Sequence, residues 1–71
     1  IVIINIKNNL MLEFSKKVLS KVSFDKDLFI KELSKSIKWI SKKEVSSLKI
    51  WTLATFSQYK NTILKVFDQV S

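Results

Sequence analysis

The side chains that could act as nucleophiles or bases in this sequence are serines, lysines and a few carboxylates. Histidine and cysteine, which supply most catalytic bases and thiol nucleophiles, are both absent. A serine–lysine dyad is therefore the one nucleophilic arrangement that the residue types allow. Serines and lysines are spread together along the predicted polar faces, so their proximity carries no signal for catalysis. We predict that the protein is not an enzyme.

The carboxylates and the backbone offer no better basis for a cofactor or metal site. Asp25 and Asp27 lie close together, but capping of a helix explains both, and two aspartates supply too few oxygen ligands for a metal ion. Zinc would need cysteine or histidine. Phosphate-binding loops need glycine, which the chain lacks, and 71 residues leave little volume for a deep pocket. We predict no cofactor, no metal and no small-molecule substrate.

The basic residues point to an anionic partner. The net charge is +7, and all thirteen basic residues are lysine, a balance that favours nucleic acid, acidic proteins or anionic lipid. The absence of arginine argues against sequence-specific DNA binding. Alternatively, the lysines reflect A/T-rich codons and form a soluble face. The denser clusters, which are our candidates for contacting an anion, are Lys16, Lys17, Lys21, Lys42 and Lys43.

Composition and periodicity together predict an all-α fold. Glycine and proline are both absent, which makes tight β-hairpins difficult to build. Hydrophobic residues make up 46% of the chain, enough for a packed core and too many for disorder. The apolar residues recur at helical spacing. We therefore predict a small bundle of three or four helices, at about residues 10–22, 25–40, 42–57 and 61–70.

The first nine residues differ from the rest. Apolar and polar residues alternate weakly there, which is a strand pattern without a partner strand. We therefore predict that residues 1–9 form an extended or irregular N-terminal extension, and that residues 10–71 form a single helical domain. Asn8 or Asn9 would cap the first helix. Met11 begins the better patterned region, and we expect the natural start of translation there.

The first two helices each show an apolar face. In the first helix, Met11, Phe14, Val18 and Val22 share a stripe, and most phenylalanines fall on such core stripes. In the second helix, capped by Ser23 or Asp25, Leu28 and Trp39 lie off the apolar face and point in nearly the same direction. Two interpretations remain open: each side chain folds over a helix end onto a neighbouring loop, or the two form a second apolar edge for a partner.

The third helix is apolar nearly all round. It follows the sequence Ser41-Lys42-Lys43-Glu44, whose spacing is that of a capping box, and Asn61 could cap the helix after it. A bundle of this size has difficulty covering every side of one helix. The third helix is therefore either the central core helix or it carries an association face. The candidate residues of that face are Ile50, Trp51 and Ala54.

These features support two hypotheses about function. The first is a protein-interaction or structural accessory module, which binds a protein partner or a second copy of itself through the third helix. The second is a cationic protein that binds membrane surfaces or, without sequence specificity, nucleic acid. In composition the chain loosely resembles leaderless cationic bacteriocins, which are compact helical bundles bearing lysine and tryptophan, but it differs in having six acidic residues and no glycine. That resemblance implies action at an anionic membrane surface.

No signal for export or for membrane insertion is evident in the sequence. A crossing helix needs about 18 or more apolar residues in a row, and no such run occurs. The first residues also lack the basic start of a signal peptide. The cytoplasm is therefore our default expectation for the location of the protein.

Overall fold

The computed structural model describes the backbone of residues 2–70 and the side chains of residues 10–70. Within that range every regular element is helical, so the prediction of a small all-α bundle is confirmed. A short 3-10 turn, η1, separates the last two helices, where we predicted a break between residues 57 and 61. The elements are α1 (Val2–Val22), α2 (Lys26–Trp39), α3 (Lys42–Thr55), η1 (Ser57–Tyr59) and α4 (Lys60–Val70).

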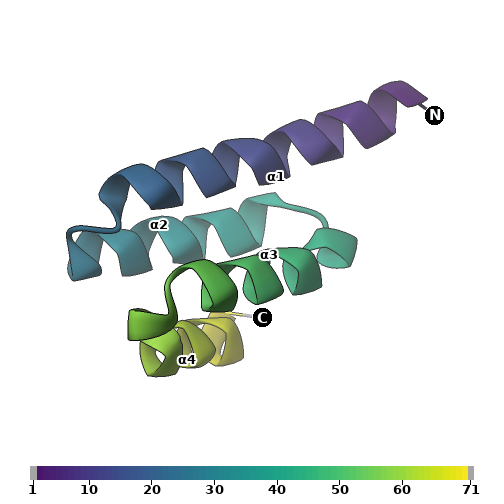
Figure 1. Cartoon of the computed structure of the whole chain (residues 1–71). Helices are drawn as coiled ribbons and strands as arrows, with labels where there is room; N and C mark the ends of the chain where they lie inside the picture. The colour runs from purple at the N-terminus through teal and green to yellow at the C-terminus, as the bar shows by residue number, and fades with distance from the viewer. Residues whose placement is uncertain (1, 71) are drawn as a thin grey trace.

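The helices pack around α2. In Figure 1, α1 and α2 run antiparallel, α3 lies in front of α2, and α4 lies beneath α3. Helix α2 makes its main contacts with α1 on one side and with α4 on the other, whereas α3 packs against α4 and touches α1 only lightly. The central helix of the bundle is therefore α2, and the interpretation of the third helix as the central core helix is wrong.

The core draws side chains from all four helices. Phe29 of α2 lies at its centre, with its ring centroid 5.0 Å from that of Phe56 and 5.1 Å from that of Tyr59. The Trp51 ring meets Phe56 edge to face at 5.5 Å, which extends the aromatic contacts from the core to the surface. The buried apolar residues are Leu12, Leu19, Phe29, Leu33, Ile37, Ile40, Leu48, Phe56, Ile63, Val66 and Phe67.

Helix α1 is longer than the periodicity predicts. It begins at Val2, so the backbone of residues 2–9 is helical where we expected an extended or irregular segment, and positions 8 and 9 lie inside the helix and not at its start. No glycine or proline interrupts these residues, and adding turns to a formed helix costs far less than starting one. At 1.5 Å per residue α1 is about 31 Å long and α2 about 21 Å. The N-terminal end of α1 therefore extends past the other helices (Figure 1).

The buried face of α1 also differs from the predicted stripe. Leu12, Ser15 and Leu19 are buried, whereas Phe14, which we assigned to the core, is 54% exposed. At 100° per residue, the apolar arc of this helix from Phe14 round to Leu12 spans about 160°. Helix α1 packs mainly on α2 and lies at the edge of the bundle, so its neighbours cover only the Leu12 and Leu19 side of that arc.

Three of the predicted helix caps can be compared directly with the structure. Asp25 is the N-cap of α2, and its carboxylate accepts a hydrogen bond from the Leu28 amide at 3.2 Å, as predicted. Ser41 is the N-cap of α3, but its hydroxyl lies 3.4 Å from the Glu44 carboxylate and makes no bond to the backbone. The capping box therefore marks the right position without its usual bonds. Asn61 lies inside α4, which starts one residue earlier, and does not cap it.

A hydrogen bond joins two distant corners of the chain. The Tyr59 hydroxyl donates to the backbone carbonyl of Ser23 at 2.7 Å, which links η1 to the turn between α1 and α2. The Tyr59 ring packs on Phe29 beneath that bond. This contact holds the α1–α2 turn against the start of α4.

Candidate interaction surfaces

A shallow groove between α1 and α3 brings together residues from both sets of candidates. It has a volume of about 440 Å³ and an apolar floor. Three of the five candidate anion-contacting lysines line it, together with one of the candidate association residues. We call it the lysine groove, and its lining residues are Glu13, Lys16, Lys17, Ser20, Lys21 and Trp51.

Trp51 lies half-buried at the floor of the lysine groove. One edge of its ring packs on Phe56, and the Lys16 ammonium nitrogen lies 5.7 Å from the ring centroid. A cation–π contact of this kind contributes about 0.5–1 kcal/mol at an exposed site. The same ammonium is 3.4 Å from the Glu13 carboxylate. Trp51 is therefore part of the packing between α1 and α3 and not a free apolar side chain on α3.

The five candidate lysines occupy two separate places, three in the lysine groove and two at the start of α3. Lys17 and Lys21 are exposed, lie one helical turn apart on α1, and have no ion-pair partner in the part of the chain whose side chains are described. Lys42 and Lys43 lie at the start of α3, where Lys42 borders a different hollow of about 470 Å³ beside Val45 and Val70. The five lysines therefore do not form one site.

The outward face of α3 is smaller than the sequence suggests. Ile50 is 70% exposed, and Ala54, one turn further along, is also exposed. Ser46 and Ser47 flank them on the preceding turn and are exposed too. The structure thus keeps two of the three predicted association residues on the surface, as a single isoleucine among small side chains.

Leu28 and Trp39, which we treated as a pair, have different surroundings. Leu28 is half-buried near the start of α2, whereas Trp39 at the end of α2 is 60% exposed. Trp39 therefore does not fold over the helix end onto a loop that would cover it. It is a separate exposed aromatic side chain.

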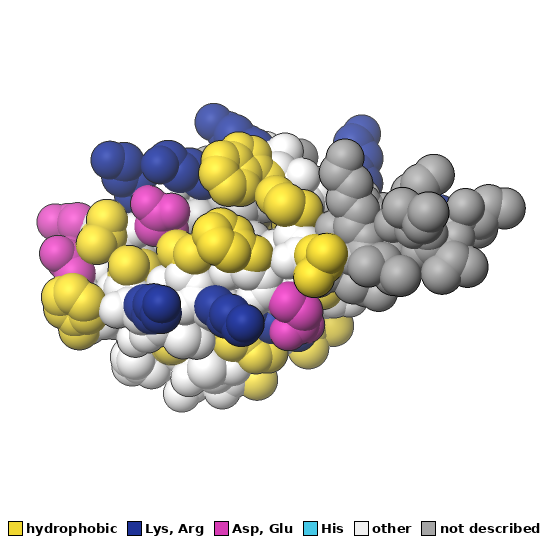
Figure 2. Space-filling model, turned by 90° about the horizontal axis from the view of Figure 1, so that it is seen from above, with side chains coloured by type: hydrophobic (Ala, Val, Ile, Leu, Met, Phe, Trp, Pro, Cys, Tyr) yellow, Lys and Arg dark blue, Asp and Glu magenta, His cyan; other side chains and the backbone are white. Residues whose placement is uncertain are grey.

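Sequence reasoning missed several exposed apolar side chains, three of them on α1 or in the turn after it. Leu10 is 62% exposed and shares a face of α1 with Phe14 one turn away, and Phe24 in the turn after α1 is 82% exposed. Figure 2, which looks down on α1, shows hydrophobic side chains separated by lysines on this side of the molecule. The signal for the true core face was a spacing of three and four residues through Leu12, Ser15 and Leu19. The serine in its middle concealed that spacing.

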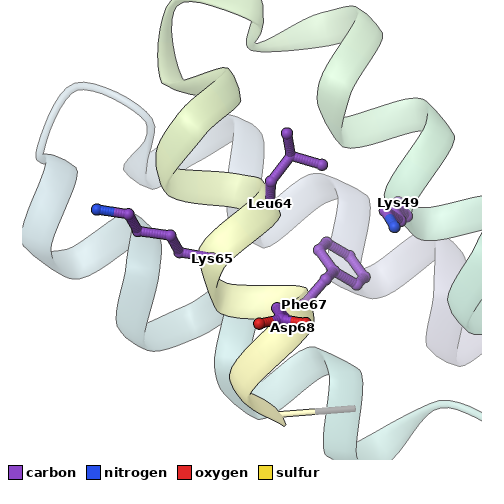
Figure 3. Close-up of a pocket in the computed structure, with 5 residues that line it drawn as sticks. All are labelled: Lys49, Leu64, Lys65, Phe67 and Asp68. Atoms are coloured by element: carbon purple, nitrogen blue, oxygen red, sulfur yellow. The ribbon is translucent and has the colours of Figure 1, made fainter.

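Another hollow lies between α3 and α4 and gathers little that could perform chemistry. Its volume is about 690 Å³. In Figure 3, Phe67 extends from α4 toward α3, whereas Lys65 extends the opposite way. The hollow contains one carboxylate and two lysines, so it does not pair a nucleophile with a base. Its lining residues are Lys49, Leu64, Lys65, Phe67 and Asp68.

The described side chains hold no cluster of three or more histidine, cysteine or acidic residues that could bind a metal ion. Their serine hydroxyls, where bonded, donate to backbone carbonyls or to Glu44. Among the described helices, none combines the length and the apolar character that a membrane crossing requires.

Comparison of the chain with protein-family models, with curated proteins and with solved structures found no match. The assignment of a function therefore depends on the surfaces described above.

Proposed function

We propose that this chain is a non-enzymatic protein-interaction module that binds an acidic protein partner. The observation that carries this proposal is the number of large hydrophobic side chains that the folded bundle leaves exposed. On α1 these include Leu10 and Phe14, which share one face, and on α3 Ile50 stands above Ala54. Grouped apolar side chains on a folded surface favour association, because covering them removes apolar area from water.

The charge of the chain favours an acidic partner over a second copy. Each copy carries a net charge of +7, so two copies repel each other, whereas an acidic protein is attracted and its approach is accelerated. Self-association through Ile50 and Ala54 is the second form of the same proposal.

Binding to an anionic membrane surface is the alternative function, and one observation favours it. Trp39 is an exposed indole beside Lys38 at the end of α2, and tryptophan flanked by lysine suits the boundary between lipid headgroups and acyl chains. Non-specific binding of nucleic acid is less favoured. The aromatic ring that Lys16 contacts, Trp51, is half-buried and packed against Phe56, so it offers a poor surface for stacking bases.

Site-specific photo-crosslinking in the cells that make the protein tests the proposal. A photoreactive residue replaces Phe14, Ile50 or, as a control, the exposed polar Gln69 of α4. We expect positions 14 or 50 to crosslink to one acidic protein that position 69 does not capture. Crosslinked dimers of the chain would instead support self-association.

A vesicle experiment separates the alternative function. Flotation with vesicles that contain anionic lipid, compared with neutral vesicles, measures membrane binding at low and high salt. Salt-sensitive flotation with anionic vesicles, together with an absence of protein crosslinks at positions 14 and 50, would replace the proposed function by membrane binding.

A further inference from the structure

The lysine groove differs from the exposed faces of α1 and α3 because it is hollow and combines an apolar floor with a charged rim. The half-buried Trp51 supplies the apolar floor, and the exposed Lys17 and Lys21 supply the charged rim. We infer that this groove binds a short acidic, amphipathic helical segment of the partner protein. This inference rests on the proposed function and adds the place and the kind of segment that is bound.

The rim is free to receive negative charge. The Lys16 ammonium pairs with the Glu13 carboxylate at 3.4 Å and lies 5.7 Å from the centroid of the indole ring. Lys17 and Lys21 are exposed and, among the described side chains, have no carboxylate partner. The groove therefore presents two uncompensated positive charges beside a neutral apolar floor.

The spacing of these two charges fits carboxylates on a helix. Residues four apart on a helix lie about 5–6 Å from one another, so Lys17 and Lys21 present their charges one turn apart. A second helix with glutamates four residues apart matches this spacing. An apolar residue between those glutamates would then rest on Trp51. Such a segment satisfies the rim and the floor together.

The shape of the groove disfavours the other anionic partners. A membrane binds through a broad apolar surface, whereas the apolar part of this shallow groove is the half-buried Trp51. A nucleic acid strand gains affinity by stacking its bases on aromatic faces, but here Lys16 lies over the indole and Phe56 packs on it. A polypeptide segment requires neither a broad surface nor an open ring.

Binding of a designed peptide tests the inference. The probe is a helical peptide of about 18 residues that carries glutamates four positions apart around a leucine stripe. The protein carries Trp39→Phe, so that Trp51 becomes its only indole. We expect the peptide to change the Trp51 emission, and to bind less tightly as salt is raised.

Charge reversal at the rim gives the decisive comparison. We expect Lys17→Glu with Lys21→Glu to raise the Kd for the peptide by about tenfold or more, because attraction becomes repulsion at both contacts. The matched control is Lys31→Glu with Lys60→Glu, two exposed lysines outside the groove. Both variants lower the net charge from +7 to +3, since each change replaces a positive by a negative charge. We expect the control to change the Kd by less than about threefold.

Three results would overturn the inference. The first is no binding of the peptide at low salt, and the second is an equal loss of affinity in both charge-reversed variants. The third is displacement of the peptide by a single-stranded oligonucleotide that binds more tightly. If crosslinking from Phe14 or Ile50 still identifies an acidic partner, the proposed function stands while the lysine groove is excluded as its site. Circular dichroism of each variant verifies the helical fold.

Discussion

Ser15 is buried on the core side of α1, and its hydroxyl oxygen has no hydrogen-bond partner among the described residues. A buried hydroxyl without a partner loses its bonds to water and gains none in return. We therefore expect Ser15→Ala to raise the free energy of unfolding by about 1 kcal/mol, since alanine removes the orphan oxygen and favours the helix. Urea denaturation followed by circular dichroism measures the change.

Ser36 provides the matched comparison for that substitution. It is also buried in a helix, but its hydroxyl donates to the Glu32 carbonyl at 2.9 Å. We expect Ser36→Ala to gain less stability than Ser15→Ala, because it removes a bond that is already made. Equal effects of the two substitutions would mean that the unpaired oxygen is not what destabilises α1.

Unlike the Ser15 hydroxyl, the Tyr59 hydroxyl is hydrogen-bonded, and its bond joins two distant parts of the chain. Tyr59→Phe keeps the ring on Phe29 and removes only the bond to the Ser23 carbonyl. We expect a loss of about 1 kcal/mol in the free energy of unfolding, because the half-buried carbonyl is left without that partner. Thermal unfolding of the variant checks this, and an unchanged midpoint would show that water replaces the hydroxyl without cost.

At the scale of the elements, the N-cap residues of α2 and α3 differ in the bonds that their side chains make. The Asp25 carboxylate accepts a backbone amide of α2, whereas the Ser41 hydroxyl reaches only the Glu44 carboxylate. We expect Asp25→Ala to lower the free energy of unfolding by about 1 kcal/mol, and Ser41→Ala to lower it by clearly less. Denaturation of the two variants side by side measures the difference, and a larger loss at Ser41 would contradict the described bonds.

The helices themselves were predictable from the sequence, but the extent and orientation of α1 were not. Helical spacing of apolar residues places α2, α3 and α4 within a few residues of their observed ends. The same spacing in α1 supports two overlapping stripes, one through Phe14 and one through Leu12 and Leu19. Which stripe is buried depends on where α2 lies, and that is a property of the packed bundle.

The candidate surfaces were predictable in part for the same reason. Exposed Ile50 and Ala54 follow from the excess of apolar residues on α3, which local periodicity reveals. The lysine groove could not be predicted in this way, because it forms only where Trp51 of α3 meets lysines of α1 some thirty positions earlier in the sequence. A contact between helices that are distant in sequence leaves no trace in the pattern of either helix.

At the scale of the whole molecule, the net charge of +7 acts on stability as well as on binding. The molecule measures 37 × 23 × 19 Å, so most of its lysines lie within a few tens of ångströms of one another. Their mutual repulsion favours the expanded chain, and dissolved salt screens it. We expect the thermal midpoint to rise as sodium chloride is increased from about 0.01 M to about 0.2 M, since the Debye length falls from about 30 Å to below 10 Å.

The salt dependence of a variant with fewer positive charges tests this expectation. The Lys31→Glu, Lys60→Glu variant has a smaller net charge, so its thermal midpoint is expected to depend less on salt. A midpoint that falls with salt in the original chain would mean instead that attractive pairs, such as Lys16 with Glu13, outweigh the repulsion.

The two indoles of this chain occupy unlike surroundings, and this gives the molecule a pair of built-in optical reporters. Trp39 is exposed to solvent at the end of α2, whereas the Trp51 ring contacts the Phe56 ring and the Lys16 ammonium group. Emission from the first reports on whatever covers the outside of the bundle. Emission from the second changes when α1 and α3 separate. Replacing one indole by phenylalanine isolates the emission of the other, so a ligand that shifts the emission of one single-tryptophan variant and not of the other reveals where it binds, with no dye attached.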